Sequence, residues 1–418
     1  MNKRDNFKGI LLYCTTFLKW FVLATIIGLV GGVIGSLFHI CIDYVTELRV
    51  HNSWLILLLP AGGILIAFVY KLCSKYGKLD TNRIIKSVQS NDSVPFILAP
   101  LIFFGASVTH LLGGSAGREG AALQLGGSIG YRVGRMSKLR EEGMHVAVMT
   151  GMASVFSALF GTPVTAAVFA IEVASVGIMH YGALLPCVIA SVAANIVSVS
   201  FGIEPVRFTI ESITGFNSAV SFLQITLIAV LCALVSILFC TSIRKCESLS
   251  KKYMSNVYLR SAFGGLLVVI LTIVLQTTDY NGAGMDIIEK AISGNARYEA
   301  FILKLVFTVI TIAAGFKGGE IVPTFFIGST FGCAVATILG FNPAFGAALG
   351  FVAMFCGVVN CPMASLILSV EVFGSEGVMV FAYVCAISYI LSGNYGLYKS
   401  QKIVYSKLDE KYIDVTAK

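Results

Sequence analysis

The chain has 418 residues, of which 56% are hydrophobic and only 12% are charged, and its mean hydropathy is +0.85. Because a soluble domain carries about 25% charged residues, this composition excludes an ordinary soluble protein and indicates one that lies in a membrane. The formal net charge of +8 is spread over several connecting segments rather than gathered in one patch, so nucleic acid is not expected as a partner.

Apolar runs recur along the whole chain and are the predicted membrane helices. In chain order they cover residues 17–43, 54–70, 96–112, 145–160, 163–178, 181–201, 218–242, 262–276, 300–315, 323–340, 343–359 and 378–392. A spanning helix needs about 17–25 predominantly apolar residues. Because several runs are shorter, we predict tilted, re-entrant or broken helices. The expected fold class is an all-α polytopic membrane protein.

Charge divides the connecting segments into two groups. Basic residues gather at 3–8, 71–86, 132–140, 244–260 and 399–418. Mixed or acidic segments lie at 43–53, 202–217 and 278–299. The positive-inside rule places the first group in the cytoplasm and the second outside. We therefore expect a multi-pass protein of the cell (inner) membrane.

Two pairs of motifs indicate an internal repeat. "FGTPVTAAVFAIEV" (160–173) resembles "VNCPMASLILSVEV" (359–372), and in each a proline is followed nine residues later by Glu-Val, at an offset of 199 residues. "GREGAALQLGGSIG" aligns with "GGEIVPTFFIGSTFG" so that Gly126 and Gly130 meet Gly328 and Gly332, at an offset of 202. A duplication of about 200 residues explains both matches.

The two copies are expected to be inverted. The segment after the first glycine-rich motif, 132–140, is strongly basic, whereas its counterpart, 334–345, has no charge. Inverted repeats are common in transporters, which bind substrate near the bilayer midplane where helices break. The domains expected are a cytoplasmic N-terminal segment (1–16), a first membrane repeat (17–203), a second, inverted repeat (204–398) and a short cytoplasmic tail (399–418).

Each copy contains a glycine-rich turn with a glutamate, namely Glu119 in "GGSAGREGAALQLGGSIG" (113–130) and Glu320 in "GFKGGEIVP" (315–323). A glycine-rich turn before a helix presents backbone N–H groups and the positive end of the helix dipole, which suits an anion. Glu119 would compete with the anion when ionised and leave when protonated. Alternatively, each glutamate only caps its helix, with Arg118 neutralising Glu119. Glu172 and Glu371 occupy matched positions and are expected to be structural.

These motifs resemble those of the CLC family of chloride channels and exchangers. The gating motif matches at Gly117, Arg118, Glu119 and Gly120, and the resemblance implies that Glu119 is the gate. In the second turn, Gly319, Ile321 and Val322 correspond to the family's other anion-binding segment, with Pro323 also matching. "GLYKSQK" resembles the segment whose tyrosine hydroxyl, here that of Tyr398, closes the inner side of the ion site. The family further implies a CLC-like inverted-repeat bundle and a homodimer.

Departures from the family pattern favour its fluoride-exporting branch. Chloride exchangers end the "FGTPVTAAVFAIEV" helix with two glutamates, whereas here Val173 follows Glu172. Glu320 stands in the second anion-binding turn, as in the fluoride branch, which implies a gating and proton-handling role. The family's serine motif is absent, and Thr81 and Asn82 of "KLDTNRIIKSV" match its region.

The sequence therefore predicts an antiporter that exports fluoride in exchange for protons. The expected partners are fluoride, with chloride as the alternative anion, together with protons, membrane lipid and a second copy of the chain. A chloride/proton exchanger or chloride channel is the alternative within the family, and a membrane enzyme or structural protein is the alternative outside it. No nucleophile–base pair or metal-ligand spacing is evident, so no enzyme activity, cofactor or metal is expected.

Overall fold

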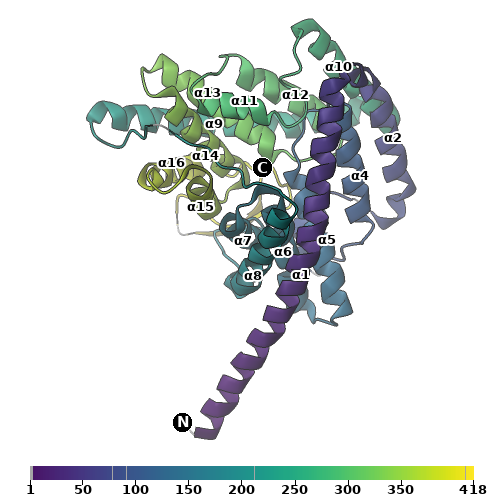
Figure 1. Cartoon of the computed structure of the whole chain (residues 1–418), viewed down its shortest axis with the longest axis vertical. Coiled ribbons are helices and arrows are strands. Elements are labelled where there is room, and N and C mark those ends of the chain that lie inside the picture. The colour runs from purple at the N-terminus through teal and green to yellow at the C-terminus, as the bar shows by residue number, and fades with distance from the viewer. Residues whose placement is uncertain (1–2, 78, 91, 211, 410) are drawn as a thin grey trace.

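The computed structural model describes residues 3–77, 79–90, 92–210, 212–409 and 411–418. Two charges used for the topology, Lys78 and Glu211, lie outside the described residues, as do residues 1–2 of the expected N-terminal segment. The described chain forms a bundle of helices (Figure 1).

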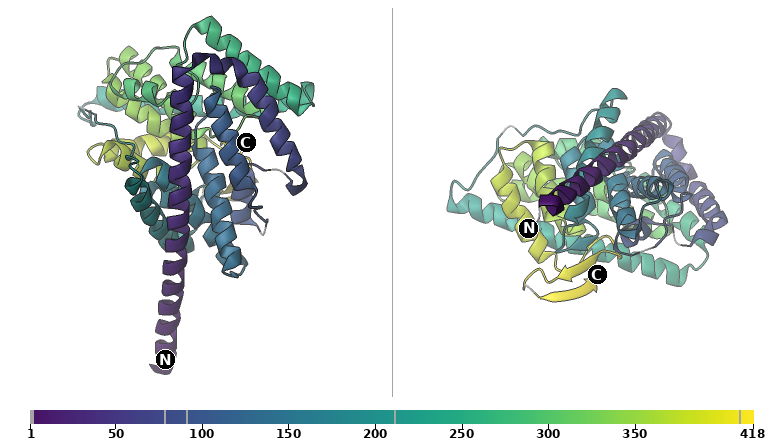
Figure 2. Two further views of the ribbon diagram at one scale, coloured as in Figure 1. Left: turned by 45° about the vertical axis from the view of Figure 1, so that its right-hand side comes forward. Right: turned by 90° about the horizontal axis from the view of Figure 1, so that it is seen from below.

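The first half of the chain contains one long helix followed by shorter helices. Its elements are α1 (Lys3–His51), η1 (Ser53–Leu58), α2 (Leu59–Leu72), η2 (Ser74–Tyr76), α3 (Thr81–Gln89), α4 (Leu98–Leu111), α5 (Glu119–Met136), α6 (Glu141–Phe160), α7 (Pro163–Glu172), β1 (Ser175–Val176), η3 (Tyr181–Ala183) and α8 (Leu184–Ser200). The N-terminal part of α1 extends beyond the other helices (Figures 1 and 2).

The second half repeats this order and ends in two strands. Its elements are α9 (Ala219–Tyr253), α10 (Val257–Leu275), α11 (Met285–Ile292), α12 (Ala300–Ala314), α13 (Ile321–Ile338), α14 (Pro343–Val359), α15 (Pro362–Phe373), α16 (Val378–Leu391), β2 (Lys402–Tyr405) and β3 (Tyr412–Thr416). Every predicted apolar run overlaps one of these helices, which confirms the predicted all-α class.

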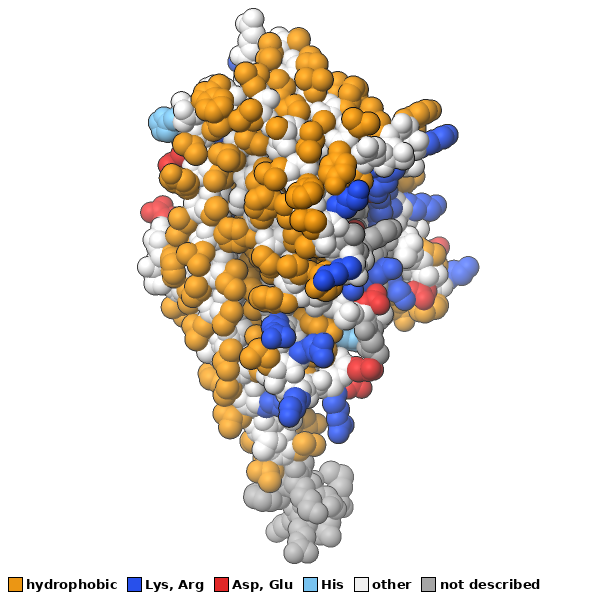
Figure 3. All heavy atoms as spheres, turned by 90° about the vertical axis from the view of Figure 1, so that its right-hand side faces the viewer, with side chains coloured by type: hydrophobic (Ala, Val, Ile, Leu, Met, Phe, Trp, Pro, Cys, Tyr) orange, Lys and Arg blue, Asp and Glu red, His pale blue; other side chains and the backbone are white. Residues whose placement is uncertain are grey.

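Apolar side chains cover much of the outside of the bundle, as a membrane protein requires. In Figure 3 they occupy most of the visible face, and lysine and arginine side chains gather along one border of it. Within the described residues, seven helices are long and apolar enough to cross a membrane, and several further apolar helices are shorter. The chain is therefore an integral multi-pass membrane protein with the short helices that the sequence predicted.

The inverted repeat is visible in reciprocal contacts between α7 and α15. The carboxylate of Glu172, at the end of α7, accepts hydrogen bonds from the backbone N–H groups of Met363 (3.2 Å) and Ala364 (2.8 Å) in the first turn of α15. Glu371 near the end of α15 accepts in the same way from Val164 (3.0 Å) and Thr165 (2.8 Å) in α7. All of these partners are related by the 199-residue offset, so a pseudo-two-fold axis passes between the two helices. The two glutamates hold the repeats together, as the structural interpretation expected.

The glycines that match between the two copies allow two helices to pack closely in each copy. A Cβ at Gly126 would lie 2.2 Å from the carbonyl oxygen of Gly151, and one at Gly328 would lie 2.3 Å from that of Gly350. These glycines let α5 pack closely on α6 and α13 on α14, and these two helix pairs have the most extensive contacts among the described elements. The repeat boundaries at 17–203 and 204–398 and the homodimer stay predictions.

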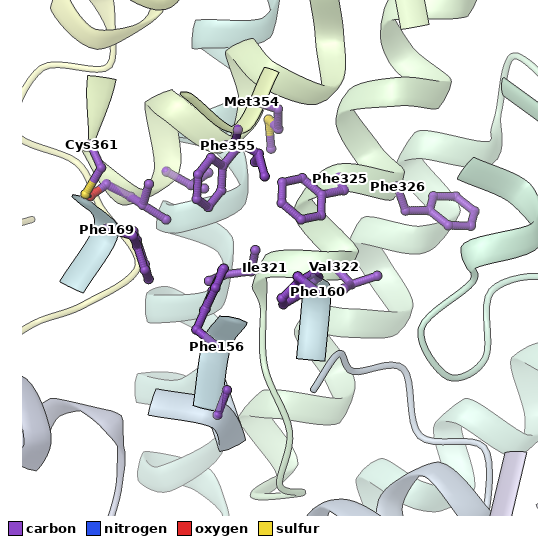
Figure 4. Close-up of a cluster of buried hydrophobic side chains, with 14 of the residues drawn as sticks. Phe156, Phe160, Phe169, Ile321, Val322, Phe325, Phe326, Met354, Phe355 and Cys361 are labelled. Carbon is purple, nitrogen blue, oxygen red and sulfur yellow. The ribbon is translucent and has the colours of Figure 1, made fainter. Parts of the chain in front are cut away.

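The main hydrophobic core of the described residues extends through both halves of the chain. Phe156, Phe160 and Phe169 of the first repeat point toward Phe325 and Phe355 of the second (Figure 4). The rings of Phe169 and Phe355 lie 5.8 Å apart, and those of Phe325 and Phe355 lie 5.2 Å apart. Aromatic packing therefore joins α7 of the first half to α14 and α13 of the second.

The tail is ordered by a small sheet that the sequence did not predict. Strand β2 pairs in parallel with β1, with Ser175 opposite Lys402, and antiparallel with β3. The two tail strands lie at the edge of the molecule (Figure 2). The side-chain amide of Gln401 donates to the carbonyl oxygens of Val173 (2.9 Å) and Val359 (2.7 Å). The sheet thus fixes the tail against the ends of α7 and α14.

Candidate anion site between the two repeats

The two glycine-rich turns meet at one point inside the bundle. The backbone N–H of Gly117 donates to the carbonyl oxygen of Gly319 at 2.7 Å, and the N–H of Gly319 donates back to Gly117 at the same distance. The two residues are 202 positions apart, which is the offset of the glycine-rich motifs. The pseudo-two-fold axis therefore also passes through this pair, and each turn is held in place by its own counterpart.

This close approach requires glycine at position 319. A Cβ there would lie 2.4 Å from the backbone nitrogen of Gly120 and 2.9 Å from that of Glu119. A Cβ at Gly120 would in turn lie 3.0 Å from the carbonyl oxygen of Gly318. The glycines predicted from the motifs thus bring two backbones together.

The pair of turns sets two helix N-termini side by side. Helix α5 begins at Glu119, and α13 begins at Ile321 directly after Glu320. The first N–H groups of a helix have no partner within it, and they carry the positive end of the dipole. The prediction that the two helix starts lie together in the bundle is confirmed.

The carboxylate of Glu119 lies across the start of α13. Its Oε2 accepts a hydrogen bond from the backbone N–H of Val322 at 3.1 Å. The side chain is fully buried, and Oε1 has no hydrogen-bond partner within the described residues. Glu119 is therefore not only a cap of its own helix, because it occupies the N-terminus of the other repeat.

Arg118 forms a salt bridge with a different carboxylate. Its guanidinium donates to Asp43 on α1 at 3.1 Å, and Asp43 also pairs with His39 at 2.8 Å. Within the described residues, the salt bridge of Arg118 is therefore the one with Asp43 and not one with Glu119.

Glu320 and Tyr398 line a cavity on the other side of the turns. The cavity has a volume of about 340 Å³ and is also lined by Thr81, Asn82 and Gln124. The ring of Tyr398 is buried, and its hydroxyl has no hydrogen-bond partner within the described residues. Glu320 makes no salt bridge within the described residues. The cavity thus brings a carboxylate and a free hydroxyl donor to one place.

Thr81 and Asn82 start α3 at the wall of this cavity. The hydroxyl of Thr81 accepts from the side-chain amide of Gln124 at 2.9 Å and lies 3.5 Å from the carbonyl oxygen of Gly120. Asn82 accepts from the backbone N–H of Ser400 at 3.0 Å. Thr81 therefore contacts the first glycine-rich turn, whereas Asn82 connects α3 to the segment that carries Tyr398.

A second cavity of about 420 Å³ adjoins the first and shares four lining residues with it, Asp80, Asn82, Glu247 and Lys251. It is lined by Lys86 and Lys399, which belong to segments that the positive-inside rule places in the cytoplasm. The two cavities together lead from the basic surface of the protein to Glu320 and Tyr398.

The sequence therefore identified most of the residues that meet here. Glu119, Gly117, Gly120, Gly319 and Val322 come together at the crossing of the turns, where Ile321 is buried as the first residue of α13. Thr81, Asn82, Glu320 and Tyr398 line the cavity.

Three further residues near the site were not predicted. They are Asp43, which binds Arg118, and Gln124 and Lys317, which line the cavity. A polar or charged side chain between apolar runs was the available signal for all three, because such residues are costly in a membrane and are usually retained for a function.

Comparison with known proteins identifies relatives over most of the chain. The sequence model of the voltage gated chloride channel family matches residues 62–393. A "Chloride/fluoride channel protein" of Pseudomonas syringae pv. tomato is 33% identical over 396 residues, covering 93% of this chain and 87% of its own length. An H(+)/Cl(-) exchange transporter of Vibrio campbellii is 24% identical, covering 84% of this chain and 81% of its own.

Two solved structures share the architecture. A crystal structure of a CLC-type fluoride/proton antiporter superposes with a TM-score of 0.88 at 31% identity, over 92% of this chain and 98% of that one. A slow cyanobacterial Cl-/H+ antiporter superposes with a TM-score of 0.77 at 18% identity, over 89% of this chain and 94% of that one, which shows the shared fold alone.

Proposed function

Because the chain belongs to the voltage gated chloride channel family, and its relatives include a fluoride/proton antiporter, we propose that it exports fluoride in exchange for protons. The observation that carries the proposal is the position of two carboxylates at one helix start. Glu119 accepts a hydrogen bond from the backbone N–H of Val322. Glu320, which lines the cavity, directly precedes α13.

Glu119 acts as a competitor of the transported anion in this proposal. An ionised carboxylate and a halide need the same N–H groups and the same dipole end. Protonation removes the charge, weakens the bond to Val322 and lets the anion take its place. Because one side chain both holds a proton and blocks the anion, proton movement and anion movement are coupled.

Glu320 and Tyr398 supply donors suited to fluoride. Fluoride is small and strongly hydrated, so a site that dehydrates it must offer strong hydrogen bonds in return. The Tyr398 hydroxyl has no other partner within the described residues. A protonated Glu320 carboxyl is a second donor, and it brings the proton that the exchange requires.

The position where chloride exchangers have a second glutamate is occupied by Val173. This residue is buried, and its carbonyl oxygen accepts from Gln401 in the tail. A proton therefore has no carboxylate to bind there, which favours Glu320 as the inner proton-binding group and supports the fluoride branch over a chloride exchanger.

The exchange is driven by the membrane potential on both ions. An anion moving out and a proton moving in each carry one charge along an inside-negative potential, worth about 2.3 kcal/mol per charge per 100 mV. For a one-to-one exchange this amounts to about 4.6 kcal/mol at 100 mV. Fluoride that enters the cell as neutral hydrogen fluoride and ionises there is thus removed against its gradient.

The test is anion selectivity in reconstituted liposomes. Vesicles are loaded with fluoride or with chloride, and the external solution is followed with a halide electrode and a pH electrode. Fluoride efflux accompanied by proton uptake, with little chloride efflux, is the expected result. Chloride turnover equal to that of fluoride would support the chloride exchanger instead, and transport of neither ion would refute both.

A further inference from the structure

The segment that carries Tyr398 has no regular secondary structure of its own. It follows the end of α16 at Leu391 and precedes β2, which begins at Lys402. The Tyr398 hydroxyl has no hydrogen-bond partner within the described residues, so no hydrogen bond of its own fixes its position. The position of the hydroxyl is therefore set by the packing of the ring and by the contacts that hold the backbone of residues 392–401.

The residues that follow β3 fold back onto this segment. The backbone N–H of Gly396 donates to the carbonyl oxygen of Lys418 at 3.1 Å, and the N–H of Lys418 donates to that of Asn394 at 2.6 Å. The N–H of Ala417 donates to the carbonyl oxygen of Gln401 at 2.9 Å. The backbone is thus bound to the tail both before and after the tyrosine.

Arg244 on α9 joins the same two parts of the chain. Its guanidinium donates to the carbonyl oxygen of Ala417 at 2.9 Å and to that of Gly396. Helix α9 packs against α14 and α16. Because one planar side chain holds both carbonyl oxygens, the tail and the tyrosine segment are fixed together against the helical bundle.

A buried polar network also holds the segment. Gln401 is fully buried, and its side-chain oxygen accepts from the amide of Asn360 at 3.0 Å. The Asn360 amide also donates to the carbonyl oxygen of Tyr395 at 2.9 Å. Buried polar groups are costly unless they are hydrogen-bonded, so each member of the network restricts the position of the next.

Lys407, in the loop between β2 and β3, completes this network. Its ammonium donates to Oδ1 of Asn360, to the carbonyl oxygen of Tyr389 at 2.8 Å and to the hydroxyl of Ser392 at 2.9 Å. Asn360 and Ser392 are the C-cap residues of α14 and α16, and the C-terminus of a helix carries the negative end of its dipole. The lysine therefore binds the tail to two helix ends at the point where the tyrosine segment begins.

We infer that the tail, through Gln401 and Lys407, positions the Tyr398 hydroxyl for the transported anion. This inference rests on the proposed function, in which that hydroxyl donates to fluoride. A hydrogen bond weakens steeply when its donor is displaced or turned, so a loosened segment binds fluoride less well. Glu119 and Glu320 are not part of the tail contacts, so the tail sets the affinity for fluoride and leaves the proton coupling unchanged.

The test is Lys407→Met in liposomes, measured alone and in combination with Tyr398→Phe. Methionine keeps the length of the side chain and removes the charge that binds the two helix ends. Because the tail acts through the tyrosine, releasing it costs no more than removing the hydroxyl, and the KM for fluoride should rise about three- to fivefold. The kcat and the number of protons moved per fluoride should not change. In the Tyr398→Phe background, Lys407→Met should add nothing to the KM, because the hydroxyl is already absent.

Lys407→Arg and Lys402→Met are the matched controls. Arginine keeps the charge and the donors and should retain most of the wild-type affinity. Lys402 lies on the same sheet, but its ammonium pairs with Asp414 at 3.5 Å and not with the tyrosine segment, so Lys402→Met should leave the KM unchanged. Hydrogen exchange in Lys407→Met should become faster in residues 394–401 and stay the same in α13, whereas a general loss of stability would speed exchange in both.

Arg244→Gln keeps the inference testable if Lys407→Met does not fold, because it releases the tail from Gly396 through a different helix. It should raise the KM to the same extent and again add nothing in the Tyr398→Phe background. An unchanged KM in the folded variants, or an equal further rise in that background, would overturn the inference. If wild-type liposomes transport chloride rather than fluoride, the proposed function fails, and the same combination of variants measured with chloride still decides whether the tail positions the tyrosine.

Discussion

Replacing Glu119 with glutamine tests the coupling between anion and proton most sharply. Glu119→Gln keeps the shape of the side chain and leaves an oxygen that can accept from the Val322 N–H, which now lies 3.1 Å from the carboxylate. Glutamine cannot ionise, so it cannot carry a proton, and it competes with an anion only as a neutral group. The variant should therefore bind the anion more tightly and transport it without moving protons.

The gain in affinity follows from the lost charge. A hydrogen bond to a charged group contributes about 1.5–3 kcal/mol, and one between neutral groups about 0.5–1.5 kcal/mol. The difference of about 1–2 kcal/mol is the competition that the ionised carboxylate exerts at the start of α13. Removing it should tighten anion binding about 5- to 30-fold.

Two assays measure these effects. Calorimetric titration of the purified protein with fluoride gives the affinity, and paired fluoride and pH electrodes on liposomes give the number of protons moved per fluoride. Proton coupling equal to that of the wild type would refute the role given to Glu119, and so would weaker anion binding in Glu119→Gln.

Three further substitutions test the remaining parts of the site. Glu320→Gln removes the second proton-binding group and should lower fluoride turnover by roughly a hundredfold in liposomes, so a fully active variant would contradict the inner proton role. Tyr398→Phe removes one donor of several and should raise the KM for fluoride by about fivefold, and an unchanged KM would show that the hydroxyl does not bind the anion. Gly319→Ala places a Cβ 2.4 Å from the nitrogen of Gly120 and should destabilise the protein by about 1–3 kcal/mol and abolish transport, as measured by thermal unfolding in detergent and by flux. Gly182→Ala, where a Cβ meets nothing within 4 Å, should be neutral, and equal effects of the two would deny a special role to the crossing of the turns.

The helices and their inverted arrangement could be predicted because membrane burial leaves a strong local signal. The apolar runs coincide with helices because each backbone polar group must be satisfied within its own segment in lipid. The offset of about 200 residues between the two repeats could be recognised because Pro163 and Pro362 begin α7 and α15 with the same first-turn geometry. The reciprocal bonds of Glu172 and Glu371 then follow from the symmetry.

The ends of α1 and the fold of the tail could not be predicted in this way. Helix α1 spans Lys3–His51, whereas the apolar run covers only 17–43, because a helix continues past the apolar segment wherever its ends find no breaking residue. Strand β2 pairs with Ser175–Val176, and β3 pairs with β2. The pairing of β2 with a segment more than 200 residues away leaves no mark in the local pattern of the tail.

In the site, too, the residues of local motifs could be predicted, whereas contacts between residues far apart in the sequence could not. Glu119 and Glu320 could be identified because glycine-rich turns with a carboxylate are local features, and Tyr398 because its segment resembles one of the CLC family. The partner of Arg118 could not be found, since Asp43 lies 75 residues away on another helix. Lys317 stands inside the quoted motif "GFKGGEIVP", but only the fold shows that it lines the same cavity as Glu320 and Tyr398.

The central claim is that one site, at the start of α13, binds the anion and the proton in turn. The most direct test records fluoride and proton fluxes together in liposomes while the membrane potential is clamped and one gradient is varied. Both fluxes should reverse at a single potential, which shifts when either the fluoride gradient or the proton gradient is changed. Fluoride flux that reverses at a potential independent of the proton gradient would contradict this account.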